Sequence, residues 1–378
     1  MSTHISISMK HHNHIHFIGI CGVAMSALAL AFHKNGYKVT GSDKGFYPPV
    51  STHLKEAGVS YYPGWHVDKM TADGNPDIVI VGNVAGSKNP EWLYVQENNL
   101  EYLSYPEAVA KYLIAENSIV CAGTYGKTTS ATIMSHIMQE TSMKTNHMFG
   151  GLALNDLPAA SMREGAEWSV VEGDEYKTSR WDDGAKFFHY SPTHILLTSA
   201  VWDHYDVYPT EELYIQAFQK LIAMIPEQGK TILSEKVPKQ IATLSNYPII
   251  TYGNSDTCDY QYSSIDQTKS GITFQITHGD EVFTLQSSIL GTYNADNITG
   301  CFAMAHQIGI DPQEIINAIA FAKLLDLPWL GEVAELAESE RAEASEVDVA
   351  GAGEVDVVRR VADPDKRPVA LRPAVDGV

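Results

Sequence analysis

Residues 118–140 read SIVCAGTYGKTTSATIMSHIMQE, an apolar run, a turn with two glycines and a helical run, and this stretch decides the fold. A phosphate-binding loop needs inward-pointing backbone N–H groups, a lysine for the β- and γ-phosphates and a hydroxyl group for Mg²⁺. Gly123 and Gly126 permit the tight curvature. Lys127 supplies the positive charge and Thr128 the hydroxyl group. The stretch therefore predicts a strand, a phosphate loop and a helix whose N-terminus faces an anion.

The loop is a variant of the common pattern, which has a further glycine where this chain has Cys121. The alternative interpretation is a glycine turn followed by a surface lysine. The preceding strand, the following helix and the order Gly-Lys-Thr-Thr argue against that alternative. We therefore expect the loop to bind ATP through Gly123, Thr124, Tyr125, Gly126, Lys127, Thr128 and Thr129.

A segment near the start of the chain follows the same order of strand, glycine turn and helix. Its predicted elements are a strand at 14–20, a turn at 21–22, a helix at 23–35 and strands at 37–43 and 76–82. Strands that alternate with helices are typical of a parallel sheet with helices on its faces. We therefore expect a Rossmann-like α/β domain over residues 14–116.

The phosphate loop opens a second α/β domain, which we expect over residues 117–321. Its predicted elements are strands at 118–123, 167–173 and 193–199, and helices at 295–307 and 312–321. The runs IITYG, YQYSSI, ITFQITH and EVFTLQ, between about 249 and 290, alternate polar and apolar residues. This alternation is typical of antiparallel hairpins, so we expect hairpins appended to a parallel sheet.

Length and composition fit a soluble protein of two or three domains. The chain has 378 residues, of which 44% are hydrophobic and 19% charged, and its formal net charge is −20. Such an acidic chain has no surplus of basic groups for nucleic-acid phosphates, so we expect no nucleic-acid partner. We also expect no membrane span and a cytoplasmic location, because the apolar runs are short and the first residues lack the apolar core of a secretory signal.

The composition changes near the end of the chain. Residues 331–378 contain no aromatic residue, and 12 acidic and 6 basic residues lie among many alanines and valines. Such segments are typical of linkers and disordered tails. We expect residues 322–378 to form an atypical tail that is disordered or joined from another source.

Acidic groups follow two predicted strands of the second domain. Glu172 ends the strand in EWSVVEG, and SAVWDHYD places Asp203, His204 and Asp206 directly after the next strand. Taken alone, each group is more often a helix cap or a solvated turn. Active-site groups collect at the carboxyl ends of parallel strands. Two such groups after a phosphate loop therefore favour metal binding.

Four of these motifs occur in the order and spacing of one known family. Over about residues 14–321 the chain resembles the Mur ligases, the ATP-dependent amide-forming enzymes of peptidoglycan synthesis, through AGTYGKTTS, VEGDEY, WDH and GTYNADN. The resemblance implies ATP and Mg²⁺ as cofactors. It also implies that the lactoyl carboxylate of UDP-N-acetylmuramate takes the γ-phosphate of ATP. A peptide or amino-acid amine then attacks the acyl phosphate.

The resemblance also implies roles for particular residues. Lys127 and Thr128 would hold ATP and one Mg²⁺. Glu172 and His204 would bind a second Mg²⁺, so the implied metal ligands are Thr128, Glu172 and His204. Lys127, Glu172 and His204 are the implied catalytic residues. Two asparagines of GTYNADN would contact adenine, namely Asn294 and Asn297; the family has a histidine where this chain has Tyr293.

Two stretches resemble one branch of the family, which joins an L-alanyl-γ-D-glutamyl-diaminopimelate tripeptide to UDP-N-acetylmuramate. They are residues 40–58, TGSDKGFYPPVSTHLKEAG, and residues 174–192, DEYKTSRWDDGAKFFHYSP. The branch that adds L-alanine shares the Gly-Ser-Asp element and stays open as an alternative. Three residues depart from the usual pattern, Tyr125, Lys177 and Val201, and none of them is an implied metal ligand.

Within this resemblance the first segment becomes the expected UDP-sugar site. GICGVAM, at 19–25, is a turn at a helix N-terminus that could receive a diphosphate. Asp43 follows Gly19 at about the spacing of the acidic residue in dinucleotide-binding domains. The bland alternative is a Rossmann-like domain without a nucleotide. The expected UDP-sugar-binding residues are Gly19, Ile20, Cys21, Gly22, Met25, Ser42 and Asp43.

Family members carry a third domain that begins with Gly-x-x-Arg-Arg after the helix that ends near Phe321, and this chain has AKLLDLPWLGE there. We therefore expect the nucleotide sites to be kept and ligation to be weak or absent. Two alternatives remain open. One is a protein that binds ATP and a UDP-sugar without turnover, and the other is an unrelated phosphate-loop ATPase.

Overall fold

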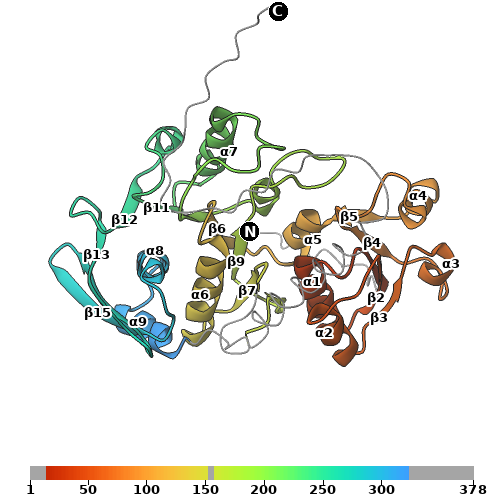
Figure 1. Ribbon diagram of the computed structural model, residues 1–378, viewed down its shortest axis with the longest axis horizontal. Helices are drawn as coiled ribbons and strands as arrows, with labels where there is room; N and C mark the ends of the chain where they lie inside the picture. Colours follow the sequence, from red (N-terminus) through yellow and green to blue (C-terminus); the bar gives the residue numbers. More distant parts are fainter. Residues whose placement is uncertain (1–13, 152–156, 323–378) are drawn as a thin grey trace, which may run out of the picture. The chain divides into compact units, whose positions relative to one another are not determined.

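The computed structural model describes residues 14–151 and 157–322, all of which belong to one compact unit of the chain. The expectation of an atypical tail concerns residues 322–378, which apart from residue 322 lie outside the described part. Figure 1 shows the arrangement of the elements. Within the described residues, no helix has the length and apolarity needed to cross a membrane.

The first sheet is a five-stranded parallel sheet with the order β3-β2-β1-β4-β5. Its strands are β1 (His14–Ile18), β2 (Lys38–Asp43), β3 (Ser60–Pro63), β4 (Ile78–Val81) and β5 (Tyr102–Ser104). The helices that connect them are α1 (Val23–Lys34), α2 (Val50–Glu56), α3 (Val67–Met70), α4 (Pro90–Glu97) and α5 (Tyr105–Tyr112). The strand order reverses between β1 and β4, which is where ligands bind in open parallel sheets.

The central strands of this sheet are apolar because both of their faces are covered. Ile15, Phe17 and Ile80 have no exposed surface. Complete burial of one such side chain contributes roughly 1.5–3 kcal/mol to folding. Ser104 begins α5 with a capping box, in which its hydroxyl accepts from the backbone of Glu107 and the Glu107 carboxylate accepts from the backbone N–H of Ser104. The N-terminal segment therefore folds as the expected parallel α/β layer.

The second sheet has ten strands in the order β15-β14-β13-β12-β11-β10-β6-β9-β7-β8. The strands up to β11 are β6 (Asn117–Ala122), β7 (Thr145–Met148), β8 (Ala160–Ser161), β9 (Trp168–Gly173), β10 (His194–Leu197) and β11 (Lys230–Ser234). The later strands are β12 (Ile249–Gly253), β13 (Tyr260–Thr268), β14 (Gly271–His278) and β15 (Glu281–Ser287). The helical elements are α6 (Lys127–Glu140), η1 (Lys186–Tyr190), α7 (Glu211–Ala223), η2 (Ile241–Leu244), α8 (Tyr293–Gln307) and α9 (Pro312–Phe321).

Strand β6, which leads into the phosphate loop, lies between β9 and β10 and is parallel to both. The mixed α/β fold with appended antiparallel strands is therefore confirmed. One detail of the prediction is wrong: β12, the run IITYG, is parallel to β11 and to the start of β13, and the antiparallel part begins with the pairing of β13 and β14. Alternation reports which face of a strand is buried and does not report the direction of its partner.

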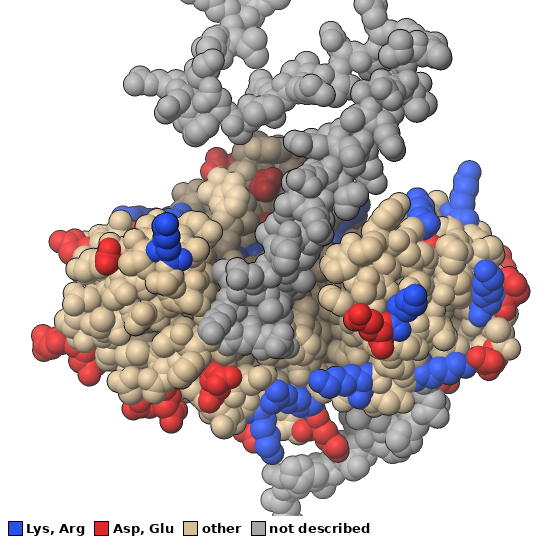
Figure 2. All heavy atoms as spheres, turned by 60° about the horizontal axis from the view of Figure 1, so that its bottom comes forward, with Lys and Arg blue, Asp and Glu red and all other residues tan. Residues whose placement is uncertain are grey.

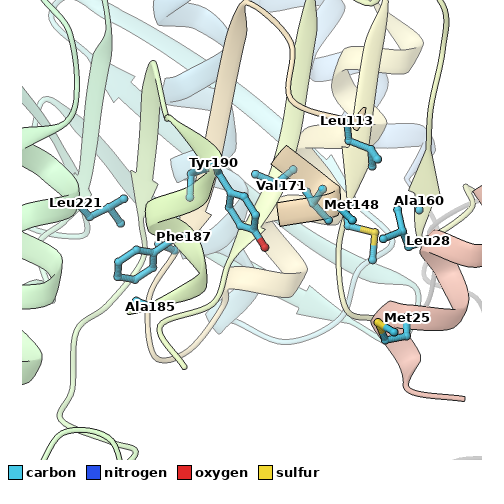
Figure 3. Packing of buried hydrophobic residues seen from close by; sticks show 14 of the residues in the cluster. Met25, Leu28, Leu113, Met148, Ala160, Val171, Ala185, Phe187, Tyr190 and Leu221 are labelled. Atoms are coloured by element: carbon cyan, nitrogen blue, oxygen red, sulfur yellow. The ribbon is translucent and has the colours of Figure 1, made fainter. Parts of the chain in front are cut away.

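The second sheet is packed against helices on both sides. Figure 1 shows α8 between α6 and the antiparallel strands, and α8 packs on β11, β12 and β13. Met148, Val171, Phe187 and Tyr190 belong to a buried cluster, which Figure 3 shows from close by. The cluster fixes the carboxyl end of β9 and the helical turn η1, and both carry residues discussed below.

Charged side chains are spread over the surface that Figure 2 shows. Lysine and arginine as well as aspartate and glutamate lie on this face.

Candidate functional site

The phosphate loop requires glycine at two positions. Gly123 has φ +135°, and a Cβ there would lie 2.4 Å from Thr198 Oγ1 and 2.8 Å from Ser199 N. Gly126 has φ +84°, and a Cβ there would lie 2.5 Å from Asn297 Oδ1. Residues with a side chain rarely adopt such φ values. The backbone of the loop is therefore pressed against the ends of β10 and α8.

Residues after β10 and on α7 hold the loop in place. Thr124 Oγ1 donates to the carbonyl of Val201 at 2.7 Å and lies 2.7 Å from the Tyr214 hydroxyl. The backbone N–H of Tyr125 donates to Ser199 Oγ at 2.9 Å. Tyr125 itself is 65% exposed, so its side chain projects from the loop. Helix α6 begins at Gly126 without a capping side chain, which leaves its N-terminus suited to an anion.

Thr128 and Glu172, both expected as metal ligands, are in direct contact. The Thr128 hydroxyl donates to Glu172 Oε1 at 2.6 Å, and the backbone N–H of Gly150 donates to Glu172 Oε2 at 2.7 Å. Hydroxyl and carboxylate oxygens are the ligands that Mg²⁺ prefers. Three or more histidine, cysteine or acidic side chains grouped as a metal site are not found among the described residues. These two oxygen donors do not by themselves make up a metal site, and their binding of Mg²⁺ stays a prediction.

Lys127 and His204 both face Glu175. Lys127 Nζ lies 3.4 Å from Glu175 Oε2, and His204 Nε2 lies 3.3 Å from Glu175 Oε1. The Tyr214 hydroxyl donates to Glu175 Oε1 at 3.3 Å, and the Glu175 side chain has no exposed surface. Burial raises the pKa of the Glu175 carboxyl, and the nearby Lys127 and His204 charges oppose this effect. His204 is thus next to Glu175, and the expected trio of Thr128, Glu172 and His204 is split into two groups.

The carboxylates of the other two acidic candidates, Asp203 and Asp206, accept hydrogen bonds from the protein itself. The Asp203 carboxylate accepts the backbone N–H of His204 at 2.7 Å. The Asp206 carboxylate accepts the Tyr176 hydroxyl at 2.6 Å. His204 has φ +56°, a strained value for a non-glycine residue, and the Asp203 contact helps to hold it. These residues shape the turn that presents His204.

The expected adenine contacts lie beside the loop. Asn294 and Asn297 are buried in the first turns of α8, and Asn297 Nδ2 donates to Asn294 Oδ1 at 3.0 Å. Asn294 Nδ2 donates to the carbonyl of Leu290 at 2.6 Å. Asn297 Oδ1 faces Gly126 of the loop. Tyr293 is 69% exposed, so its ring projects away from this hydrogen-bonded pair.

The turn after β1 is held by the end of β2. The backbone N–H groups of Gly19 and Ile20 donate to the carbonyl of Ser42 at 2.8 and 3.1 Å. The backbone N–H of Cys21 donates to Asp43 Oδ2 at 2.8 Å. Burial, with a contribution from Asp43, raises the pKa of the Cys21 thiol to about 12. The turn therefore leads directly into α1, whose N-cap residue Gly22 provides no capping side chain.

Ser42 and Asp43 thus bind the protein itself. The Ser42 hydroxyl donates to the carboxylate of Glu91, a residue of α4 with no exposed surface. Asp43 uses its second oxygen to accept the backbone N–H of Lys44 at 2.7 Å. The two residues hold the shape of the turn in this structure, and their expected contact with a UDP-sugar stays a prediction.

A cavity of about 340 Å³ adjoins both the turn after β1 and Glu172, the partner of Thr128. It is lined by Gly22, Val23, Ala24, Met25, Val81, Gly82, Asn83, Tyr105, Gly150, Glu172, Asp174, Thr178, Lys186 and Tyr190. Most lining residues of the N-terminal segment lie just after β1 or at the end of β4, the two strands between which the strand order reverses, and Tyr105 follows β5. Glu172 links the cavity to Thr128 of the phosphate loop. A ligand in this cavity could therefore reach both the N-terminus of α1 and the hydrogen-bonded pair of Thr128 and Glu172.

The fold and the loop define an α/β protein of the phosphate-loop class. Residues 14–116 match the family model described as "Mur ligase family, catalytic domain", and residues 121–305 match the "Mur ligase middle domain". The chain belongs to the Mur ligase family. This confirms the resemblance seen in the sequence.

Relatives in two branches are similar to the chain. It is 30% identical over 309 residues to UDP-N-acetylmuramate–L-alanyl-γ-D-glutamyl-meso-2,6-diaminoheptandioate ligase of Haemophilus influenzae, covering 81% of this chain and 67% of that protein. It is also 30% identical over 295 residues to UDP-N-acetylmuramate–L-alanine ligase of Lactobacillus johnsonii, covering 77% of this chain and 63% of that protein. The chain thus spans about two thirds of the length of the relatives it matches.

Solved structures agree with the fold. The murein peptide ligase of Psychrobacter arcticus superposes with a TM-score of 0.69 at 27% identity, covering 81% of this chain and 68% of that one. A structure of the tripeptide ligase from Neisseria meningitides gives a TM-score of 0.74 at 24% identity, covering 83% of this chain and 99% of that one. The second comparison bears on the fold alone.

Several residues of the site were not singled out from the sequence. Glu175 lies inside the VEGDEY motif, three positions after Glu172, and the motif was a signal for it. Tyr214 lies on α7, far along the chain from the loop that it contacts, and nothing in its local sequence marks it. Lys186 lies in a stretch quoted only for its branch resemblance, and its contact with Asp174 requires the fold.

Proposed function

We propose that the chain acts as an ATP-dependent amide ligase of peptidoglycan synthesis or recycling, with UDP-N-acetylmuramate as the acid substrate. The single observation that carries this proposal is the cavity that reaches from the N-terminus of α1 to Glu172, which contacts Thr128 of the phosphate loop. A UDP-sugar carboxylate in that cavity would lie near the γ-phosphate of ATP. The names of the relatives in both branches support UDP-N-acetylmuramate as that substrate.

In the proposed reaction the lactoyl carboxylate attacks the γ-phosphorus of ATP, and ADP leaves. The free amine of the second substrate then attacks the acyl phosphate, and inorganic phosphate leaves as the amide forms. Lys127 would bind the β- and γ-phosphates, and the N-terminus of α6 would face the same anion. Asn294 and Asn297 would contact the adenine. Catalysis would consist mainly of positioning and charge neutralisation.

Mg²⁺ fits the oxygen donors of this site. The Thr128 hydroxyl would bind one ion, and Glu172 and His204 would bind a second. When bound, Mg²⁺ neutralises negative charge on the phosphoryl group that is transferred. The chain's own contribution is to hold Thr128, Glu172 and Lys127 in one small region at the end of β9.

We propose that each of the two sheets belongs to the binding site of a different substrate. Residues 14–116 would bind the UDP-sugar, with the diphosphate at Gly22 and the N-terminus of α1, and residues 117–321 would bind ATP. For the amine, we propose the L-alanyl-γ-D-glutamyl-diaminopimelate tripeptide, and L-alanine is the alternative. The tripeptide is favoured because the solved structure with 27% identity is a murein peptide ligase. The curated relatives of the two branches are equally similar to the chain, at 30% identity.

The experiment is a measurement of phosphate release from ATP with the two co-substrates supplied singly and together. Release that needs both UDP-N-acetylmuramate and an amine supports the ligase, and comparison of tripeptide with L-alanine selects the branch. Nucleotide binding without release supports a non-catalytic protein that binds ATP and a UDP-sugar. Hydrolysis that ignores the UDP-sugar supports an unrelated ATPase and rejects the proposal.

A further inference from the structure

The charges around the cavity are unbalanced for an acidic substrate. Among the described residues that line it, Glu172 and Asp174 are acidic and Lys186 alone is cationic. A substrate that carries a reactive carboxylate would meet both acidic groups as it approached the phosphate loop. The negative charges of Glu172 and Asp174 oppose binding of a substrate carboxylate unless a cation lies between them. Lys186 is therefore the group that decides whether a carboxylate can enter.

Lys186 is held in a defined position. It is the first residue of η1, and its backbone N–H donates to the carbonyl of Tyr176 at 3.1 Å. Its ammonium group forms an ion pair with the carboxylate of Asp174 and lies 5.7 Å from the centroid of the Tyr176 ring. The Lys186 side chain is 17% exposed. The Lys186 ammonium is therefore held beside Asp174 at the edge of the cavity.

The two positive features of the cavity come from different parts of the chain. Helix α1 begins at Gly22 without a capping side chain, and its twelve residues are long enough for its N-terminus to attract a diphosphate. Lys186 lies on the wall formed by Glu172, Asp174 and Tyr190, and Figure 3 shows Met25 on α1 and Tyr190 on η1, both of which line the cavity. The diphosphate of a UDP-sugar would thus meet the N-terminus of α1, and its reacting carboxylate would meet the Lys186 ammonium.

We propose that Lys186 binds the lactoyl carboxylate of the acid substrate while it keeps its ion pair with Asp174. This inference rests on the proposed function and assigns one specificity-determining contact within it. A lysine ammonium has three donors and can keep a bond to Asp174 while it turns toward a second carboxylate. Without this contact the substrate carboxylate would be repelled from the cavity by Asp174 and Glu172.

The test compares two ligands that differ in the carboxylate. UDP-N-acetylmuramate carries the lactoyl group, and UDP-N-acetylglucosamine is the same nucleotide sugar without it. Equilibrium binding of both is measured by calorimetry for the wild-type chain, Lys186→Gln, Lys186→Arg and the control Lys220→Gln. Lys220 is a matched lysine on α7 whose ammonium lies over the Phe188 ring, away from the residues that line the cavity.

We expect Lys186→Gln to weaken binding of UDP-N-acetylmuramate by about 10- to 100-fold and to change binding of UDP-N-acetylglucosamine by about twofold or less. Lys186→Arg should recover most of the loss, and Lys220→Gln should have no effect. Equal losses for both ligands would overturn the inference, because they would place Lys186 at the diphosphate or give it a structural role. Unchanged binding of UDP-N-acetylmuramate would also overturn it.

A double variant distinguishes two causes of weaker binding. One is the loss of the attraction between Lys186 and the substrate carboxylate, and the other is repulsion by Asp174 once its partner Lys186 is removed. Asp174→Asn combined with Lys186→Gln removes the charge that Lys186→Gln leaves without its partner. If Lys186 binds the carboxylate, the double variant still fails to prefer UDP-N-acetylmuramate over UDP-N-acetylglucosamine. A wild-type chain that binds neither ligand rejects the proposed function together with this inference. A wild-type chain that prefers UDP-N-acetylmuramate, with Lys186→Gln equal to it, rejects the inference alone.

Discussion

The ammonium nitrogen of Lys127 lies 3.4 Å from Oε2 of Glu175, a carboxylate with no exposed surface. The same carboxylate holds His204 at 3.3 Å through its other oxygen. The lysine of the phosphate loop thus has an internal counter-ion in Glu175. A bound triphosphate would have to compete with Glu175 for this lysine.

Replacement Glu175→Gln should therefore strengthen nucleotide binding. The amide is neutral and similar in shape, so Lys127 would be free to bind phosphate, and a negative charge near the triphosphate would be gone. We expect affinity for a fluorescent ATP analogue to rise by about three- to tenfold. Glu212→Gln, at an exposed position of α7, is the control. Weaker or equal binding by Glu175→Gln would show that Glu175 does not compete for Lys127.

Replacement Lys127→Ala should remove ATP-dependent phosphate release. Loss of a cation that neutralises charge on the transferred phosphoryl group lowers turnover by about 100-fold or more. The measurement is phosphate release with UDP-N-acetylmuramate and an amine present, with circular dichroism to show that the fold persists. The exposed Lys144→Ala, just after α6, should retain wild-type turnover. Turnover by Lys127→Ala at the wild-type rate would reject the assignment of the loop.

Replacement Gly126→Ala should destabilise the loop more than a similar change at an open glycine. A Cβ on Gly126 would meet Asn297 Oδ1 at 2.5 Å, whereas Gly279 has φ +59° and no atom within 4 Å of such a Cβ. We expect Gly279→Ala to lower the free energy of unfolding by about 1 kcal/mol, and Gly126→Ala by a further 1–3 kcal/mol or so. Urea denaturation measures both. Equal decreases in the free energy of unfolding for Gly126→Ala and Gly279→Ala would contradict this prediction, because Asn297 would then move away from the added Cβ at no cost.

His147 should make the protein less stable in mild acid. Burial lowers the pKa of His147 to about 4, although its ring nitrogen Nε2 lies 2.8 Å from the carbonyl of Pro158, a contact that raises the pKa. The unfolded chain, with a pKa near 6.5, takes up the proton first, so stability is full above about pH 6.5 and falls as the pH decreases toward 4. Between pH 7 and pH 5 this one residue should lower the free energy of unfolding by about 2 kcal/mol.

The check is the pH dependence of urea denaturation for the wild-type chain, His147→Gln and His53→Gln. His53 is an exposed histidine on α2 and serves as the control. The loss between pH 7 and pH 5 should become smaller in His147→Gln and stay as in the wild type in His53→Gln. A His147→Gln profile parallel to that of the wild type would contradict a neutral buried His147.

Most elements of the fold could be predicted from the sequence because they depend on local patterns. The expected helix at 23–35 is α1 (Val23–Lys34), and the expected strand at 118–123 is β6 (Asn117–Ala122). The parallel pairing of β12 was not predictable from alternation, since both kinds of sheet bury one set of alternate residues.

The site was less predictable because its contacts join distant segments. The phosphate loop is a local motif, whereas the burial of Glu175 depends on Tyr208 and Tyr214, which contact it from more than 30 positions away. Spacing alone suggested that Asp43 binds a ligand. In the structure its carboxylate accepts the backbone N–H of Cys21, a contact that requires β1 and β2 to be neighbours.

The most direct test of the account is calorimetric titration of the chain with Mg²⁺ and the β,γ-imido analogue of ATP, which is not hydrolysed. Saturable binding at one site per chain, lost in Lys127→Ala and kept in Lys144→Ala, is the predicted result. Absence of binding at millimolar analogue, or equal binding by wild type and Lys127→Ala, would contradict the claim that residues 123–129 form a nucleotide-binding loop.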